Sequence, residues 1–325
     1  MANASAVRRM AFAAGLAAMT AAGPVHSAER TEVLTIGSGA RAKPAKIRAE
    51  LLLPDTTAGK KIPAMLIMHG SAAPRDRREG AYAREFLKLG VAAVIVDSFT
   101  LRGIKSTVRD QSQVSSTDML IDAVNAMRAV AERPEIDASR IGLIGFSKGG
   151  SVAAKAALQR YKKFVGPNPH DFSLLIAMYP WCGDMPFDFT PAGAQLFLML
   201  GEADTYAGVP ACKEFGERLK KKGGDVTVWV FAGAKHDWDT PGRESWSDAK
   251  GENFSQCIYD EIQPGTWIER KSRIKIEDNG KRTGKSKDAQ ARCVTIGVGG
   301  GYSAKAHAES TELIRTAIRQ KFNLP

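Results

Sequence analysis

The order of apolar segments predicts an α/β fold built on a mostly parallel, doubly wound sheet. Continuous apolar runs, such as 64–68 and 91–96, are typical of strands buried on both faces of such a sheet. Segments with helical spacing, such as 117–132, lie between these runs, and this alternation is characteristic of parallel strands joined by crossover helices. The chain has 325 residues, of which 44% are hydrophobic, so it can bury a large core.

The first 28 residues have the pattern of a secretory signal peptide. Arg8 and Arg9 precede the apolar, Ala-rich stretch 10–22, and residues 25–27 offer a cleavage site. An uncleaved membrane anchor is the alternative, although the apolar stretch is short for a span. We therefore expect a periplasmic or secreted protein whose residues 29–325 form a single α/β domain.

All four cysteines follow the predicted signal peptide. They are Cys182, Cys212, Cys257 and Cys293, and an even number in an exported chain indicates disulfides. Three pairings are possible, and we favour Cys182–Cys212 with Cys257–Cys293 because each closes a local loop; buried free thiols are the alternative. No C-x-x-C pattern occurs, so we predict no metal site and no cofactor.

The net charge is +11, and loss of residues 1–27 removes two arginines and no acid, which leaves +9. Much of the basic charge lies in 269–292 and is not interleaved with aromatic residues along a groove-like series. We therefore predict no nucleic-acid partner. Peripheral contact with an anionic envelope surface and an ordinary solvated hairpin both remain open.

The remaining elements follow in chain order. Residues 32–36 and 45–53 predict a hairpin, because Ile47, Ala49 and Leu51 alternate and the connection is polar. We then expect the strand 64–68, a helix over 80–89, the strand 91–96, a polar loop over 100–116 and a helix over 117–132 with Thr117 as N-cap.

In the second half of the chain, predicted strands and helices continue to alternate up to about residue 240, and the alternation then ends. The patterns predict strands over 141–144, 173–178, 195–200 and 226–231, and helices over 151–160 and 209–222. Residues 240–303 are polar and basic, which predicts an inserted β-hairpin region bracketed by Cys257 and Cys293. A last helix over 304–322 should return to the sheet.

The stretch Gly145-Phe-Ser-Lys-Gly149 lies between a predicted strand and a predicted helix. This order is that of a nucleophile elbow, a sharp turn that exposes the hydroxyl of Ser147. Glycine is needed at 145 and 149 because a Cβ there would clash with the neighbouring strand or helix. The pattern also arises by chance, so the assignment needs a base, a carboxylate and an oxyanion hole.

His236 is the candidate base. It follows the last predicted parallel strand in a loop, and loops at the carboxyl ends of parallel strands are where catalytic groups converge. A solvated loop histidine is the alternative, with His307 as a further candidate. The other histidines of the mature chain, His69 and His170, precede the elbow or a strand.

Asp204 is the candidate carboxylate, because it follows the strand 195–200 at the tip of a Gly-x-x-Asp loop; Glu202 is its competitor. It would accept the Nδ1 proton of His236 and stabilise the imidazolium. The chain order serine, acid, histidine is that of α/β-hydrolases.

The oxyanion hole should consist of two backbone N–H groups. One belongs to Lys148, the residue after the nucleophile, whose side chain we expect to be solvated. The other is assigned to Ser71, which follows the strand 64–68. Phe99, Trp181 and Trp238 are candidates to line an apolar substrate pocket, and ordinary core aromatics are the alternative.

These motifs together resemble the dienelactone hydrolase family of α/β-hydrolases over about residues 32–240 and again in the last helix. The resemblance is carried by the segments His69-Gly70, Asp97-Ser-Phe99 with Arg102-Gly103, Gly145–Gly149, Tyr179-Pro-Trp-Cys182, Gly201-Glu-Ala-Asp204 and His236–Gly242. It implies an α/β-hydrolase fold, and exported members with cysteines matching Cys182 and Cys212 support that disulfide.

Two features depart from the family. The type enzymes have a cysteine nucleophile where this chain has Ser147, which favours general carboxylic ester chemistry over dienelactone cleavage. The basic region 240–303 has no counterpart in a minimal family domain.

We therefore predict a serine hydrolase that acts on a small-molecule ester or lactone through an acyl-enzyme. A catalytically idle envelope protein that binds a ligand is one alternative, and a peptidase with the same triad is another. The sequence does not indicate an oligomeric state.

Overall fold

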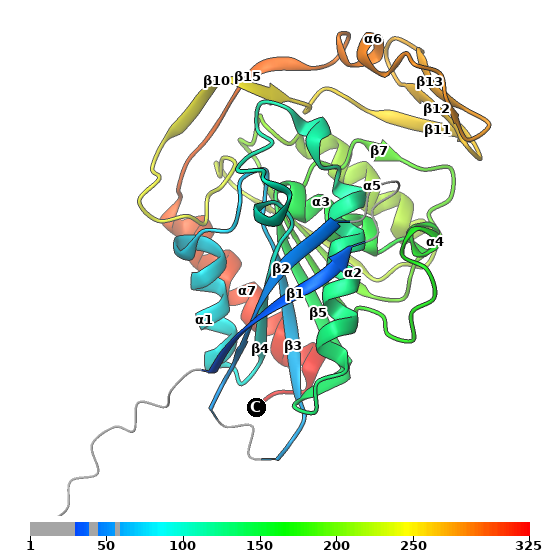
Figure 1. The fold of residues 1–325 in the computed structure, drawn as a ribbon. Coiled ribbons are helices and arrows are strands. Elements are labelled where there is room, and N and C mark those ends of the chain that lie inside the picture. Colours follow the sequence, from blue (N-terminus) through cyan, green and yellow to red (C-terminus); the bar gives the residue numbers. More distant parts are fainter. Residues whose placement is uncertain (1–29, 39–44, 56–58) are drawn as a thin grey trace, which may run out of the picture.

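The computed structural model describes residues 30–38, 45–55 and 59–325, so the predicted signal peptide lies outside the described residues. An eight-stranded sheet forms the centre of the molecule, in the order β1-β2-β4-β3-β5-β6-β8-β9 (Figure 1). Its strands are β1 (Arg30–Ser38), β2 (Ala45–Leu53), β3 (Ile62–Met68), β4 (Ala92–Asp97), β5 (Ile136–Phe146), β6 (Leu174–Met178), β8 (Gln195–Gly201) and β9 (Val226–Phe231).

Most neighbouring strands of this sheet run parallel. β1 pairs with β2, and β2 with β4, in antiparallel register, whereas every pair from β4 through β9 is parallel. The predicted α/β-hydrolase fold is therefore confirmed. Because parallel strands end at the same edge, the loops after β3, β5, β8 and β9 meet there.

Helices cover both faces of the sheet. They are α1 (Ala81–Lys88), α2 (Ser116–Ala131), α3 (Lys148–Ala156), α4 (Lys162–Val165), α5 (Val209–Lys221), α6 (Ser286–Gln290) and α7 (Ala304–Phe322). The apolar sides of α2, α3 and α5 pack on one face, and those of α1 and α7 pack on the other. The two resulting layers of buried side chains are the core on which the site rests.

Two predicted helix starts are wrong. α2 begins at Ser116 because Ser115, not Thr117, is its N-cap; the Ser115 hydroxyl accepts from the N–H of Asp118, whose carboxylate accepts from the N–H of Ser115. α3 begins at Lys148 rather than at residue 151, since the turn at Ser147 leads straight into the helix.

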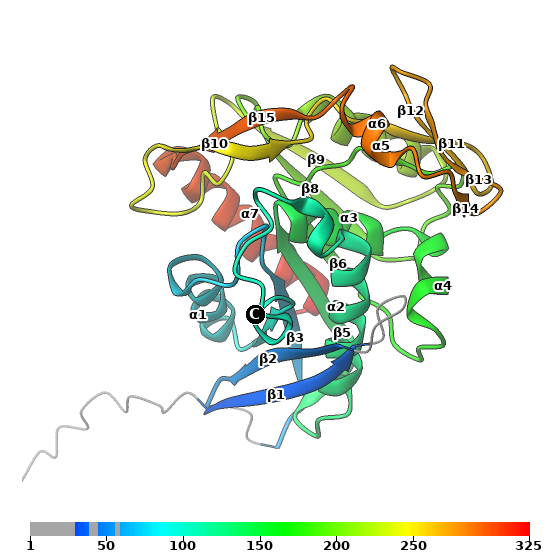
Figure 2. The ribbon, with the colours of Figure 1, turned by 45° about the horizontal axis from the view of Figure 1, so that its top comes forward.

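The predicted hairpin region is larger than a hairpin. β10 (Trp246–Asn253) pairs with β15 (Thr295–Gly300). Between them, β11 (Tyr259–Gln263), β12 (Thr266–Glu269), β13 (Lys275–Asp278) and β14 (Lys281–Arg282) form a second sheet, which recruits β7 (Asp184–Met185) from the main body. We call residues 246–300 the cap, because they arch over the edge of the sheet where the parallel strands end (Figures 1 and 2).

Both favoured cysteine pairs are bonded. Cys182, after β6, is joined to Cys212 on α5, and Cys257 is joined to Cys293 across the cap. The second bridge closes the loop that contains β11 to β14. Two disulfides fit an exported protein. Within the described residues, no helix has the length and apolarity needed to span a membrane.

Candidate active site

The turn after β5 holds Ser147 in a strained conformation. Its φ is 53° and its ψ is −112°, values that a residue with a side chain rarely adopts. A Cβ on Gly145 would lie 2.0 Å from the Gly149 carbonyl oxygen, and one on Gly149 would lie 2.2 Å from the Met68 carbonyl oxygen. Both glycines are therefore required, as the motif predicts.

Ser147, His236 and Asp204 form one hydrogen-bonded chain. His236 Nε2 lies 2.9 Å from Ser147 Oγ, and His236 Nδ1 lies 2.8 Å from Asp204 Oδ2. Because an ionised carboxylate only accepts, Nδ1 donates to Asp204 and Nε2 is left to accept from the serine hydroxyl. His236 is 4% exposed and Asp204 is 7% exposed, so water competes little for these bonds.

Backbone donors hold the second oxygen of Asp204. The N–H groups of Tyr206 and Ala207 donate to Asp204 Oδ1 over 2.8 and 3.0 Å. Glu202 is exposed and accepts from the N–H of Gly233, which places it outside this chain of contacts. His307, the other candidate base, lies near the start of α7 beside Tyr302.

The loop after β3 passes beside the serine. A Cβ on Gly70 would lie 3.2 Å from the Phe146 carbonyl oxygen and 3.4 Å from Ser147 Cβ, so the backbone approaches closely. His69 is fully buried, and its Nε2 accepts from the N–H of Ser98 over 3.1 Å. Burial lowers the pKa of His69, which fits a neutral ring that fastens this loop to the end of β4.

The Lys148 side chain is not solvated, contrary to the prediction. Its ammonium donates to Thr107 Oγ1 and to the carbonyl oxygens of Gln111 and Val114 over 2.7–3.1 Å. Burial lowers the pKa of Lys148 to about 7. The side chain thus fastens the 100–116 loop to the elbow, an arrangement that no pattern in the sequence indicates.

A cavity of about 1240 Å³ opens beside the serine. Ser71, Ser147, Tyr206 and His236 line one part of it, and residues of the 100–116 loop, α2, α3 and the cap line much of the rest. Its volume exceeds the 300–1,000 Å³ that is usual for a small-molecule pocket. The edge of the sheet therefore offers room for a substrate next to the Ser147 hydroxyl.

The three aromatic residues that were candidates to line the pocket have different positions in the structure. Trp181 lines the cavity. Phe99 and Trp238 are both fully buried and do not line it. Phe99 packs edge-on against His69, and Trp238 packs against Tyr179 and donates to the Ser310 hydroxyl on α7. These two are core aromatics.

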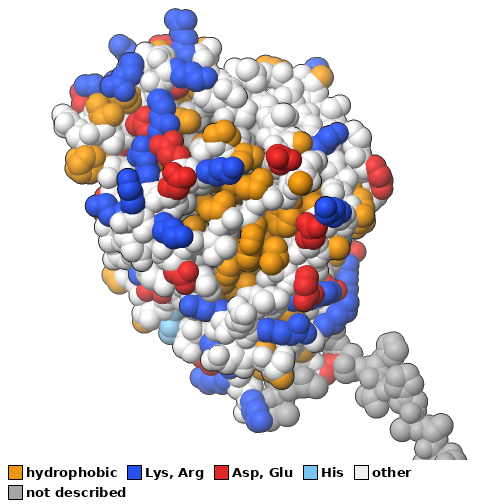
Figure 3. All heavy atoms as spheres, turned by 180° about the vertical axis from the view of Figure 1, so that it is seen from behind, with side chains coloured by type: hydrophobic (Ala, Val, Ile, Leu, Met, Phe, Trp, Pro, Cys, Tyr) orange, Lys and Arg blue, Asp and Glu red, His pale blue; other side chains and the backbone are white. Residues whose placement is uncertain are grey.

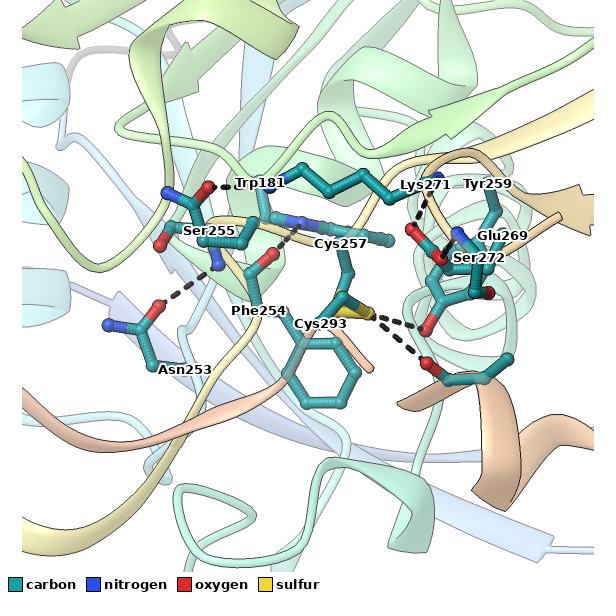
Figure 4. Close-up of a disulfide and its surroundings, with 12 residues drawn as sticks. Trp181, Asn253, Phe254, Ser255, Cys257, Tyr259, Glu269, Lys271, Ser272 and Cys293 are labelled. Atoms are coloured by element: carbon teal, nitrogen blue, oxygen red, sulfur yellow. Dashed lines mark hydrogen bonds between the residues drawn. A yellow bond between two sulfur atoms is a disulfide. The ribbon is translucent and has the colours of Figure 1, made fainter. Parts of the chain in front are cut away.

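The cap contacts the site through residues that lie just before Cys257. Trp181 Nε1 donates to the Phe254 carbonyl oxygen over 2.9 Å, close to the Cys257–Cys293 bridge (Figure 4). Glu252 accepts from the N–H of Gln111 over 2.7 Å, and Gly301 donates to the His236 carbonyl oxygen over 2.9 Å. The cap is therefore bonded to the cavity wall, and Gly301, the residue directly after the cap, is bonded to the histidine loop.

A buried charge network lies beneath the histidine loop. The Arg78 guanidinium donates to Glu79 Oε1 and, over 2.9 Å, to Asp237 Oδ1, and it stacks 4.9 Å from the Phe146 ring. The neighbouring Arg78 charge contributes to the lowered pKa of Asp237, against the effect of burial. The sequence does not indicate this network, because Arg78 and Asp237 lie 159 positions apart.

Comparison with known proteins points to one family. The model of the dienelactone hydrolase family matches residues 56–259. No curated protein sequence matches the chain.

Two solved structures illustrate the similarity in fold. The dienelactone hydrolase-like promiscuous phosphotriesterase P91, from metagenomic libraries, is 14% identical, with a TM-score of 0.56 over 90% of this chain and 99% of its own. Apo esterase 2 of Thermogutta terrifontis is 18% identical, with a TM-score of 0.51 over 65% of this chain and 87% of its own. At these identities the likeness concerns the fold.

Proposed function

The chain belongs to the dienelactone hydrolase family of ester hydrolases, and from this premise we propose that it cleaves carboxylic esters or lactones with Ser147 as nucleophile. The observation that supports the proposal is the continuous hydrogen-bonded chain from Ser147 through His236 to Asp204 at the wall of the cavity. A serine hydroxyl is a weak nucleophile at its free pKa, and this arrangement supplies both the base and the group that orients it.

The first half of the reaction forms the acyl-enzyme. His236 Nε2 takes the hydroxyl proton as Ser147 Oγ bonds to the ester carbonyl carbon. The carbonyl oxygen becomes an oxyanion, which the N–H groups of Lys148 and Ser71 stabilise. As the tetrahedral intermediate collapses, the carbon–oxygen ester bond breaks and the alcohol leaves with the proton from Nε2.

Water completes the cycle. His236 takes a proton from a water molecule, whose oxygen bonds to the acyl carbon. The carbon–Oγ bond then breaks, Ser147 regains its proton from Nε2, and the carboxylic acid is released. Asp204 stays ionised and stabilises the imidazolium at each proton transfer.

The direct test is a substrate panel on the mature protein with a Ser147→Ala variant as control. We expect short-chain aryl esters and lactones to be hydrolysed, and Ser147→Ala to lower kcat by roughly 10³-fold or more. A fluorophosphonate probe should label the wild type at Ser147 and leave the variant unlabelled. An unchanged rate in Ser147→Ala would refute the assignment.

The same panel separates the alternatives. A catalytically idle binding protein would neither hydrolyse the esters nor react with the probe. A peptidase would also cleave peptide anilides, which an esterase would leave intact.

We further propose that the protein works in the periplasm or outside the cell, with the basic cap in contact with an anionic envelope surface. Figure 3 shows lysine and arginine side chains gathered at the end of the molecule that the cap forms. Contact of this kind weakens with salt.

Vesicle binding tests this contact. We expect the protein to bind phosphatidylglycerol vesicles at low ionic strength and phosphatidylcholine vesicles weakly. Replacing the exposed Lys285 and Lys287 by Glu should weaken binding more than the same change at the exposed Lys221 and Lys222 beside α5. Equal binding by both double variants would contradict a cap-specific contact.

A further inference from the structure

Tyr206 occupies a position that the sequence does not single out. It lies in the turn that presents Asp204, because its N–H donates to Asp204 Oδ1 over 2.8 Å. Its ring centroid lies 4.7 Å from that of His236. Tyr206 is 9% exposed and lines the cavity together with Ser71 and Ser147. Its hydroxyl is thus fixed next to the site by bonds to the backbone and by ring packing.

The surroundings of the Tyr206 hydroxyl direct it towards the loop after β3. Gln111 Nε2 donates to the Tyr206 oxygen over 3.3 Å, so one of its acceptor positions is used. Gln111 Oε1 accepts from Ser71 Oγ over 3.1 Å, so the Gln111 side-chain amide links the Tyr206 hydroxyl to the side chain of Ser71. The phenol oxygen accepts from Gln111, which leaves its proton free to donate, and it lies in the same cavity wall as Ser71, whose N–H is the proposed oxyanion donor.

The environment keeps this hydroxyl available as a donor. Burial raises the pKa of Tyr206 to about 12, so the phenol is protonated over the whole working range of an esterase. Gln111 itself is held in place by the ammonium of Lys148 and the carboxylate of Glu252. A donor that is fixed before the reaction begins stabilises developing charge without reorganisation.

We propose that the Tyr206 hydroxyl is a third donor to the oxyanion, beside the N–H groups of Lys148 and Ser71. The inference rests on the proposed serine esterase function. In the resting enzyme Gln111 links the phenol to the Ser71 side chain, and as the tetrahedral intermediate forms the phenol donates to the new oxyanion. Tyr206 is then a catalytic residue, which contacts the reacting carbonyl oxygen.

Tyr206→Phe isolates this hydroxyl, because it retains the ring that packs on His236. Loss of one oxyanion donor costs roughly 10²–10³ in kcat, so we expect a fall of about 10²-fold with KM changed less than about threefold. A trifluoromethyl ketone, which forms a tetrahedral oxyanion adduct with the serine, should lose affinity by the same factor as kcat/KM. The matched control is Tyr302→Phe, which removes a half-buried hydroxyl beside His307 and should leave kcat unchanged.

A double variant distinguishes a donor from a positioning residue. If Tyr206 only holds Gln111 in place, Gln111→Leu should cost as much as Tyr206→Phe, and combining the two should cost nothing further. We expect instead that Tyr206→Phe lowers kcat by a further tenfold or more in the Gln111→Leu background.

The outcomes separate the two proposals. If the wild type hydrolyses esters through Ser147 and Tyr206→Phe retains the wild-type kcat and inhibitor affinity, the donor role is refuted and the esterase function stands. If fluorophosphonate fails to label Ser147 and no ester is hydrolysed, both proposals fall.

Discussion

Replacing Arg78 by methionine should make the protein much less stable to unfolding, although Arg78 lies in the short helical turn Asp76–Gly80 before α1. Its side chain is 5% exposed, and its partners Glu79 and Asp237 are 0% and 3% exposed. Methionine would fill much of the volume and restore none of the hydrogen bonds. Two buried carboxylates would lose a guanidinium that donates three hydrogen bonds, two to Glu79 and one to Asp237.

The expected cost follows from what remains after the substitution. Removing one partner of a buried ion pair typically destabilises a protein by about 3–5 kcal/mol, because the other charge stays buried without compensation. Arg243 still donates to Asp237, so part of that carboxylate remains paired. Among the described residues, Glu79 would keep only the backbone N–H of Arg75 and no charged partner. We therefore expect a loss of about 3 kcal/mol, a large share of the 5–15 kcal/mol usual for a domain.

Urea unfolding followed by tryptophan fluorescence, with both disulfides intact, measures this loss. Arg84→Met is the matched control, because the Arg84–Asp76 pair is exposed and pairs of that kind contribute at most about 1 kcal/mol. A loss below about 1 kcal/mol in Arg78→Met, or an equal loss in both variants, would refute the role assigned to the network. The activity of Arg78→Met should also fall, since Asp237 directly follows His236.

Three further predictions concern the site and its support. Asp204→Asn should lower kcat by about 10⁴-fold on an aryl ester, because an amide no longer fixes the Nδ1 proton of His236; a loss below tenfold would contradict this. Gly145→Ala should lower kcat by at least about 10²-fold, since its Cβ meets the Gly149 oxygen at 2.0 Å, whereas Gly37→Ala, with nothing within 4 Å, should leave kcat unchanged. Burial raises the pKa of Asp239 to about 6, above its unfolded value of about 3.9, so the contribution of Asp239 to stability falls as pH rises through that window. The stability of Asp239→Asn relative to wild type should therefore increase between pH 4 and 7 in urea unfolding, and a pH-independent difference would contradict it.

Local sequence was sufficient to predict most strands of the central sheet, because strands that are buried on both faces have a recognisable pattern. Such strands must be continuously apolar, and their limits are marked by polar or glycine residues. The predicted runs 64–68 and 91–96 lie within two residues of the limits of β3 and β4, which are buried along almost their whole length. Errors occurred at helix starts, where Ser115 and Thr117 are both good N-caps and only the bonds formed decide between them.

Sequence by itself also determined the order in which Ser147, Asp204 and His236 follow their strands, because each lies just past an apolar run and parallel strands end together. What only the tertiary structure decided is the direction of side chains. Lys148 bends back to the 100–116 loop, Phe99 and Trp238 turn into the core, and Arg78 bonds to a residue 159 positions away. The physical reason is that a strand pattern fixes which face a backbone presents, whereas a polar side chain takes its partner from whatever segment packs beside it.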